Sequence, residues 1–217
     1  MTDRKKIAAE AQAFFDKLWS DGDPWDFESN PFEISKYEAQ LAMLDADRGS
    51  RRYGTALEIG CANGTFTRRL STRCDRVVGV DIAESAISLA SERNRAAGLE
   101  NVEYRVGNIM DWKDELNGQW DLVILAETVY YLGWLYPFFD VAWFAHCLFQ
   151  GSSPDARLLL CNTCGGVEDY LMKPWIVRTY HDLFRNAGYV TIRDDVFRGN
   201  RNGSDMEALL TLLRKPA

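Results

Sequence analysis

Short apolar runs alternate with amphipathic segments along most of this chain. Seven runs have the length and the branched-residue content of β-strands; they span residues 55–59, 76–80, 102–106, 121–126, 157–161, 189–197 and 208–213. Four other segments place apolar residues at helical spacing, at 65–72, 85–97, 137–149 and 175–186. Strands and helices that alternate with short links predict a doubly wound α/β sheet.

The last two predicted strands differ from the others because no helix separates them. Only ten residues, 198–207, join them, and this link contains two glycines and two asparagines. Such a link predicts a β-hairpin. We therefore expect a Rossmann-like, seven-stranded sheet that is mostly parallel, with one antiparallel strand near the C-terminus.

The first fifty residues follow another pattern. Residues 7–19 and 35–45 have apolar positions at helical spacing, and a turn-rich loop at 20–27 carries Trp25 and Phe27. We expect one domain overall, in which an N-terminal helical lid segment (1–50) covers a Rossmann-like core (51–217).

Composition and charge narrow the class of protein. Apolar residues make up 47% of the 217 residues, which favours a folded globule over disorder. The formal net charge of −7 argues against a nucleic-acid partner, because phosphate binding needs a basic face. The most apolar region, 129–149, contains Asp140 and His146 and is not typical of a membrane span. The N-terminus lacks an apolar signal region, and the five cysteines form no secreted framework, so we expect a cytoplasmic protein.

The strongest motif follows the first predicted strand. Gly60 and Gly64 allow a tight turn and a close approach of a ligand to the backbone. Asp81 ends the second strand, where a carboxylate can accept hydrogen bonds from both hydroxyls of a ribose. In a doubly wound sheet, ligands bind at these carboxyl ends.

A nicotinamide-binding loop is the alternative for this motif. It requires G-x-G-x-x-G, but Ala62 and Thr65 stand where the second and third glycines belong. Glu58, two residues before Gly60, would repel a pyrophosphate and would tolerate a ligand with an amino group. The spacing therefore counts against a nicotinamide-dependent oxidoreductase.

The sequence Glu58-Ile59-Gly60-Cys61-Ala62-Asn63-Gly64 resembles the first motif of class I S-adenosylmethionine-dependent methyltransferases. The stretches 78–81, 107–109 and 120–127 resemble their second, third and fourth motifs. The resemblance implies that S-adenosylmethionine is the cofactor and S-adenosylhomocysteine the product. It also implies cofactor contacts from Glu58, Gly60, Cys61, Ala62, Gly64, Asp81, Ile82, Asn108, Ile109 and Glu127.

Stretches along the whole chain are similar to a narrower group, the rhizobial nodulation N-methyltransferases (NodS-like). They lie at 23–27, 35–38, 58–61, 73–75 and 127–132. That resemblance implies a small-molecule acceptor, such as an amino group on a sugar of a chitooligosaccharide or on another natural-product metabolite.

Three residues are candidates for the catalytic site. Glu127 follows the fourth strand, next to the expected methyl group, and Tyr130 and Tyr131 lie just beyond it. A carboxylate or a tyrosine oxygen could orient an amine and take its proton. Trp25 and Tyr37 are candidates for cofactor contact, since aromatic faces attract a sulfonium cation.

Other chemistry-bearing residues have simpler interpretations. We expect His146 and His181 to be packed or at the surface, and Cys161 and Cys164 to be two thiols after the fifth strand. No metal ligand set is apparent, so no metal is expected. The aromatic stretch 134–149 could support a homodimer, which leaves monomer and dimer open.

Several functions remain open at this point. Because no aspartate–histidine pair is evident as a strong base, N-methylation is favoured over O-methylation of a small metabolite. A nicotinamide-binding oxidoreductase and an inactive nucleotide-binding module are the remaining alternatives.

Overall fold

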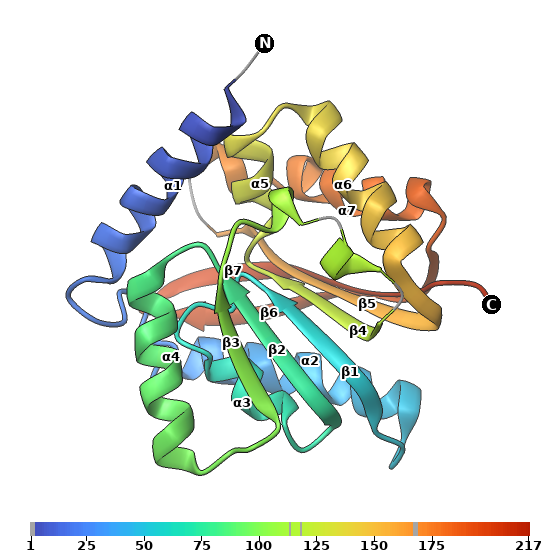
Figure 1. The fold of residues 1–217 in the computed structure, drawn as a ribbon, viewed down its shortest axis with the longest axis horizontal. Coiled ribbons are helices and arrows are strands. Elements are labelled where there is room, and N and C mark those ends of the chain that lie inside the picture. Colours follow the sequence, from blue (N-terminus) through green and yellow to red (C-terminus); the bar gives the residue numbers. More distant parts are fainter. Residues whose placement is uncertain (1–2, 113, 118, 167–168) are drawn as a thin grey trace.

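A computed structural model describes residues 3–112, 114–117, 119–166 and 169–217 (Figure 1). The strands are β1 (Tyr53–Ile59), β2 (Cys74–Asp81), β3 (Val102–Val106), β4 (Trp120–Ala126), β5 (Ser152–Gly165), β6 (Val190–Arg201) and β7 (Ser204–Arg214). The helices are α1 (Arg4–Trp19), α2 (Pro31–Arg48), α3 (Thr65–Leu70), α4 (Glu84–Ala97), α5 (Val129–Leu135), α6 (Phe138–Gly151) and α7 (Pro174–Ala187). None of the helices within these ranges is long and apolar enough to cross a membrane.

The seven strands form one sheet in the order β3-β2-β1-β4-β5-β7-β6. Neighbouring strands from β3 to β5 are parallel, and β7 is antiparallel to both β5 and β6. The predicted fold class is therefore confirmed. Strand order reverses between β1 and β4, and a doubly wound sheet binds its ligands at this switch point.

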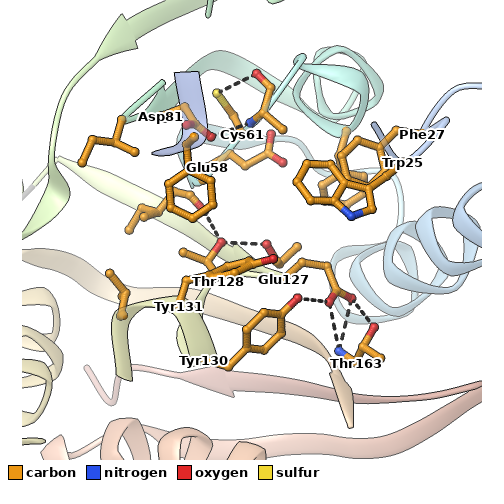
Figure 2. A pocket seen from close by; sticks show the side chains of 18 of the residues that line it. Trp25, Phe27, Glu58, Cys61, Asp81, Glu127, Thr128, Tyr130, Tyr131 and Thr163 are labelled. Atoms are coloured by element: carbon orange, nitrogen blue, oxygen red, sulfur yellow. Dashed lines mark hydrogen bonds between the residues drawn. The ribbon is translucent and has the colours of Figure 1, made fainter. Parts of the chain in front are cut away.

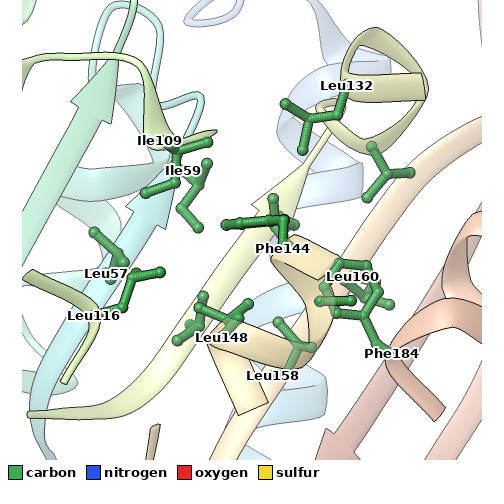
Figure 3. Packing of buried hydrophobic residues seen from close by; sticks show 14 of the residues in the cluster. Leu57, Ile59, Ile109, Leu116, Leu132, Phe144, Leu148, Leu158, Leu160 and Phe184 are labelled. Carbon is green, nitrogen blue, oxygen red and sulfur yellow. The ribbon is translucent and has the colours of Figure 1, made fainter. Parts of the chain in front are cut away.

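Both faces of the sheet are covered by helices (Figure 1). On one face, Leu57, Val123 and Leu158 pack with Phe144 of α6 and Phe184 of α7 (Figure 3). The alternate residues of the same strands point to the opposite face. There they meet α2 and α3, so the core consists of two apolar layers separated by the sheet.

The two N-terminal helices have different positions. Leu41 and Leu44 of α2 are buried against the sheet. Helix α1 lies outside this layer and contacts α4, where Ser85 hydrogen-bonds to Asp16 (Figure 1). Helix α2 starts at Pro31, earlier than the sequence pattern predicted, because Asn30 caps it and proline suits the first helical turn.

Three larger features also differ from the predictions. The ten-residue link shrinks to a two-residue turn, Asn202-Gly203, because both residues adopt the positive φ that a tight hairpin requires. Helix α5 was not predicted as a separate element. Strand β5 continues along β7 to Gly165, so Cys161 and Cys164 lie within the strand and not after it.

Candidate active site

One cavity of about 240 Å³ opens at the carboxyl ends of the parallel strands (Figure 2). Of the predicted site residues, it brings together Trp25, Tyr37, Glu58, Gly60, Cys61, Ala62, Asp81, Ile82, Asn108, Ile109, Glu127, Tyr130 and Tyr131. Gly64 is not in the lining. It starts α3 with φ +72°, and a Cβ there would lie 2.2 Å from the Tyr104 hydroxyl.

The loop after β1 has the geometry that its glycines predict. Gly60 has φ +75°, and an added Cβ would lie 2.4 Å from Oγ1 of Thr128. Ala62 also has a positive φ, 51°, in a region that a non-glycine residue rarely adopts. Its backbone N–H donates to Oδ2 of Asp81 over 2.9 Å, which fixes this turn.

Asp81 joins the loop to the start of the next helix. Its second oxygen, Oδ1, accepts the backbone N–H of Ala83 over 2.9 Å. Burial raises the pKa of Asp81, while the two backbone hydrogen bonds act in the opposite direction. A carboxylate oxygen can accept more than one hydrogen bond, so Asp81 retains capacity for ribose hydroxyls.

Glu58 lies beneath the loop, almost fully buried, and accepts a hydrogen bond from the Thr67 hydroxyl of α3. Burial raises its pKa to about 8 despite this bond. The protonated form therefore predominates near neutral pH, because a lone carboxylate is costly in this environment.

The N-terminal segment forms an aromatic wall of the cavity. Trp25 and Phe27 stack with ring centroids 5.5 Å apart, and Tyr37 stacks on Phe66 of α3 over 5.2 Å. Asp23 holds this loop, since its carboxylate accepts the N–H groups of Trp25 and Phe27. The same carboxylate accepts the Asn63 amide over 2.7 Å, which ties the segment to the glycine loop.

Asn108 and Ile109 lie where β3 ends. The side-chain oxygen of Asn108 accepts the N–H of Met110, and its amide donates to Asp111. Asn108 thus caps the 3-10 helix Ile109–Asp111 and lines the cavity at the same time.

Among the described side chains that line the cavity, Glu127 accepts the largest number of hydrogen bonds (Figure 2). Its carboxylate accepts from Lys36 Nζ over 2.8 Å, from the Tyr130 hydroxyl over 2.7 Å, and from both the N–H and the hydroxyl of Thr163. Burial acts to raise the pKa of Glu127, but Lys36 and these hydrogen bonds hold it below the ordinary value. Glu127 is therefore an ionised, nearly saturated acceptor.

Sequence reasoning missed two of the three partners of Glu127, Lys36 and Thr163. Lys36 of α2 is only 3% exposed and forms a second ion pair with Glu33 over 2.8 Å, and Arg201 of β6 lies 3.4 Å from Glu33. Burial alone lowers the pKa of Lys36, yet the two carboxylates outweigh it and the net pKa is raised. The sequence did contain an indication that Lys36 is buried, because Glu33 and Lys36 share one helix face with the apolar Leu41 and Leu44.

The two candidate tyrosines differ in their surroundings. Tyr130 is buried and its hydroxyl is committed to Glu127. Tyr131 is partly exposed, and its ring packs edge-on against Phe15 of α1 over 5.2 Å. Within the described ranges its hydroxyl has no hydrogen-bond partner, so it is available to a ligand.

The two histidines, which were not expected to act in the site, do not line the cavity. His146 is partly buried beside Trp143, and His181 is fully buried. Within the part of the chain that the structure describes, no group of side chains could hold a metal ion. Three aromatic side chains of α6, Phe138, Phe139 and Trp143, are exposed, while a homodimer stays a prediction.

Solved structures share this architecture. The N-methyltransferase NodS from Bradyrhizobium japonicum WM9, in complex with S-adenosyl-l-homocysteine, superimposes with a TM-score of 0.77. The match covers 95% of this chain and 98% of that chain at 20% identity. A Burkholderia thailandensis 1,6-didemethyltoxoflavin-N1-methyltransferase gives a TM-score of 0.72 at 17% identity, over 100% of this chain and 92% of that chain. The fold is thus that of S-adenosylmethionine-dependent methyltransferases.

The family model for nodulation protein S (NodS) matches residues 8–135. The chain therefore belongs to the NodS family. Nodulation protein S of Rhizobium tropici is 36% identical over 112 residues, which is 51% of this chain and 44% of that protein. The chain spans about half the length of the curated nodulation proteins it matches.

Proposed function

We propose that this protein is an S-adenosylmethionine-dependent methyltransferase that methylates an amino group of a small molecule, such as an amino sugar or a natural-product metabolite. The observation that carries the proposal is one continuous cavity at the carboxyl ends of the strands. It joins the glycine loop and Asp81 at one end to Glu127 and the two tyrosines at the other.

The loop end of the cavity suits the cofactor chemically. Asp81 offers carboxylate oxygens to a ribose diol, and no basic side chain lies among the loop residues to favour a pyrophosphate. Trp25 and Phe27 present stacked ring faces to the cavity, and such faces attract a cationic sulfonium. S-adenosylmethionine supplies a methyl group that its positive charge already activates.

The Glu127 end of the cavity favours an amine over a hydroxyl acceptor. A hydroxyl must lose its proton to become an effective nucleophile, which requires a base with a pKa near the working pH. Glu127 is a poor base because Lys36 and the hydrogen bonds lower its pKa. Among the described residues that line the cavity there is no histidine.

A neutral amine needs only orientation. Its nitrogen forms a bond to the methyl carbon as the carbon–sulfur bond breaks, and the resulting ammonium then loses a proton to water. The Tyr131 hydroxyl can hold the amine by a hydrogen bond, while the negative charge of Glu127 stabilises the positive charge that develops on nitrogen. Proximity and alignment supply most of the rate enhancement in such a displacement.

We also propose that the N-terminal segment closes the site as a lid. The loop that carries Trp25 is attached at two points: Asp23 binds Asn63 of the glycine loop, and Arg201 donates to the Trp25 carbonyl over 3.2 Å. Closure by these contacts would exclude water from the methyl group.

A matched pair of acceptors tests the reaction. A chitosan oligomer carries free amino groups, whereas the chitin oligomer of equal length has the same ring hydroxyls with every amine acetylated. We expect S-adenosylhomocysteine formation and a one-methyl mass gain with chitosan only. Methylation of both oligomers would instead indicate an O-methyltransferase.

Thermal unfolding tests the cofactor independently of the acceptor. A ligand present at about 100 times its Kd stabilises a fold by roughly 2.7 kcal/mol. We expect S-adenosylhomocysteine to raise the Tm and NADH to leave it unchanged. The reverse result would point to a nicotinamide-binding protein, and cofactor binding without turnover of any acceptor would indicate an inactive module.

A further inference from the structure

The side chain of Asn162 supports the turn that carries Glu127. Asn162 is fully buried in β5, and its Oδ1 accepts the backbone N–H groups of Thr128 over 3.0 Å and of Val129 over 3.3 Å. These N–H groups stand at the start of α5, where a helix has no carbonyl of its own to pair them. Asn162 therefore caps α5 from the neighbouring strand.

The other half of the Asn162 amide is also engaged. Its Nδ2 donates to the carbonyl of Leu125 over 3.2 Å and lies 3.1 Å from Nε2 of His181. Two accepted and two donated hydrogen bonds are the full capacity of an amide side chain. Its orientation is therefore fixed by partners on β4, α5 and α7.

His181 extends this network away from the cavity. Its Nδ1 lies 3.1 Å from Oγ1 of Thr211, and the Thr211 hydroxyl donates to Asp194 over 2.7 Å. Because Nδ2 of Asn162 can only donate, Nε2 of His181 must accept this hydrogen bond. Nδ1 of His181 therefore carries the hydrogen and donates it in a hydrogen bond to the Thr211 hydroxyl oxygen. Each hydrogen bond of the network is thus donated in the same direction, away from the Glu127 turn and toward Asp194.

The ring of His181 keeps this arrangement over the working pH range. Burial, with a smaller contribution from Arg185 and Arg178, lowers its pKa to about 3. A neutral ring is required, since protonated Nε2 could not accept from Asn162.

The turn itself needs such support. Glu127 has φ +52°, a conformation that a non-glycine residue keeps only where its surroundings enforce it. Its N–H donates to the carbonyl of Cys161 over 2.8 Å, and Thr163 binds its carboxylate. Three consecutive residues of β5 therefore hold the turn, and Asn162 is the one that fixes the backbone after Glu127.

We propose that Asn162, oriented by His181, is a positioning residue for methyl transfer: the pair holds the Glu127 turn where the acceptor nitrogen meets the methyl group. The inference rests on the proposed function. Neither side chain is in the cavity lining, so both act through Glu127 and Thr128.

Two substitutions at His181 separate positioning from mere packing. His181→Gln keeps an acceptor for Asn162 and a donor for Thr211, whereas His181→Leu removes both and fills a similar volume. With the chitosan oligomer as acceptor, we expect His181→Leu to lower kcat roughly 10-fold or more without weakening S-adenosylhomocysteine binding. His181→Gln should recover most of kcat. Equal kcat in the two variants, or a parallel loss of cofactor affinity, would overturn the proposal.

Nuclear magnetic resonance tests the network without any acceptor. We expect His181 to show a protonated Nδ1 and an unprotonated Nε2, with the Thr128 and Val129 amide signals displaced in His181→Leu and restored in His181→Gln. Unmoved amide signals would refute the link between His181 and the turn. If His181→Leu fails to fold, the isosteric Thr211→Val must displace the same signals. An enzyme that leaves the chitosan oligomer unmethylated refutes the proposed acceptor, while these signals still decide the network.

Discussion

The two ends of the cavity are assembled in different ways. At the loop end, Gly60, Asp81 and Asn108 each lie at or just after the carboxyl end of a parallel strand, and their main contacts are with nearby backbone. At the other end, Lys36 reaches across 91 positions of sequence to Glu127. The first end is a property of strand–loop–helix units, whereas the second exists only when α2, β4 and β5 are packed together.

The two ends of the cavity also affect the stability of the fold in different ways. The loop end depends on backbone conformation and on hydrogen bonds to N–H groups. The Glu127 end depends on buried charges that must neutralise one another, since an uncompensated charge in an apolar interior is strongly destabilising. Variants that separate these two kinds of dependence test the comparison.

The largest effect is expected from removing the buried cation. Lys36→Met leaves Glu33 and Glu127 as neighbouring carboxylates without their shared partner. We expect a loss of about 3–5 kcal/mol in the free energy of unfolding at neutral pH. Urea denaturation measures it, and the loss should shrink at acidic pH, because Glu127 without Lys36 becomes protonated more readily.

Lys6→Met provides the control, because Lys6 is exposed on α1 and its ion pair with Glu10 is a surface contact. The double variant Lys36→Met/Glu127→Gln should recover part of the lost stability. A loss below about 1 kcal/mol for Lys36→Met would show that the charges are not coupled as the geometry indicates.

Glu58 gives the next largest effect, through pH. Its pKa is about 8 in the folded protein against the ordinary value of 4.5 for a glutamate, so at intermediate pH the folded state holds a proton that the unfolded state releases. The contribution of Glu58 to stability is therefore complete below about pH 4.5 and is lost as the pH rises through 8. The slope is at most about 1.4 kcal/mol per pH unit.

Glu58→Gln keeps an acceptor for Thr67 and removes the titration. We expect the free energies of unfolding of the variant and the unaltered protein to converge at low pH, with the variant gaining relative stability toward pH 8. Denaturant titrations across this range measure the difference. Parallel curves would mean that Glu58 is ionised in the folded protein.

Asp81→Ala should act on the loop end alone. Asp81 binds the Ala62 and Ala83 N–H groups, and we propose that it also binds the ribose. Loss of this charged acceptor is expected to weaken S-adenosylhomocysteine binding about 10- to 100-fold by calorimetry. Asp75→Ala is the control, since Asp75 lies at the other end of the same strand and pairs with Arg52 at the surface. Equal affinities in the two variants would remove Asp81 from the cofactor site.

The comparison also explains which features the sequence could predict. Strand and helix alternation predicted all seven strands, because buried parallel strands such as β4 are apolar along their length. The short helix α5 was missed because seven residues carry too little periodicity. The extent of β5 and β6 was missed since pairing with β7, and not local pattern, decides where they end.

The same distinction applies to the site. Glycine spacing and strand ends placed Gly60 and Asp81 at the cavity, and the resemblance to the third methyltransferase motif placed Asn108 there. Lys36 was not predicted, because a lysine on an amphipathic helix is exposed far more often than buried. Asn162 was missed for a related reason: its role depends on Thr128, which follows the neighbouring strand β4 and is distant in the sequence.

The smallest effect is expected from Tyr131→Phe, and it tests the boundary between the two ends. The Tyr131 hydroxyl lines the cavity and has no hydrogen-bond partner among the described residues, so its removal should lower kcat/KM for the chitosan oligomer about 2- to 10-fold, the value of one neutral hydrogen bond. Affinity for S-adenosylhomocysteine should stay unchanged.

Tyr130→Phe should lower kcat/KM further, because it takes a donor from the ionised Glu127. Tyr170→Phe, an exposed tyrosine outside the cavity, is the control. A weaker cofactor affinity in Tyr131→Phe would place this hydroxyl at the loop end, and the acceptor would then be oriented by Glu127 and its partners alone.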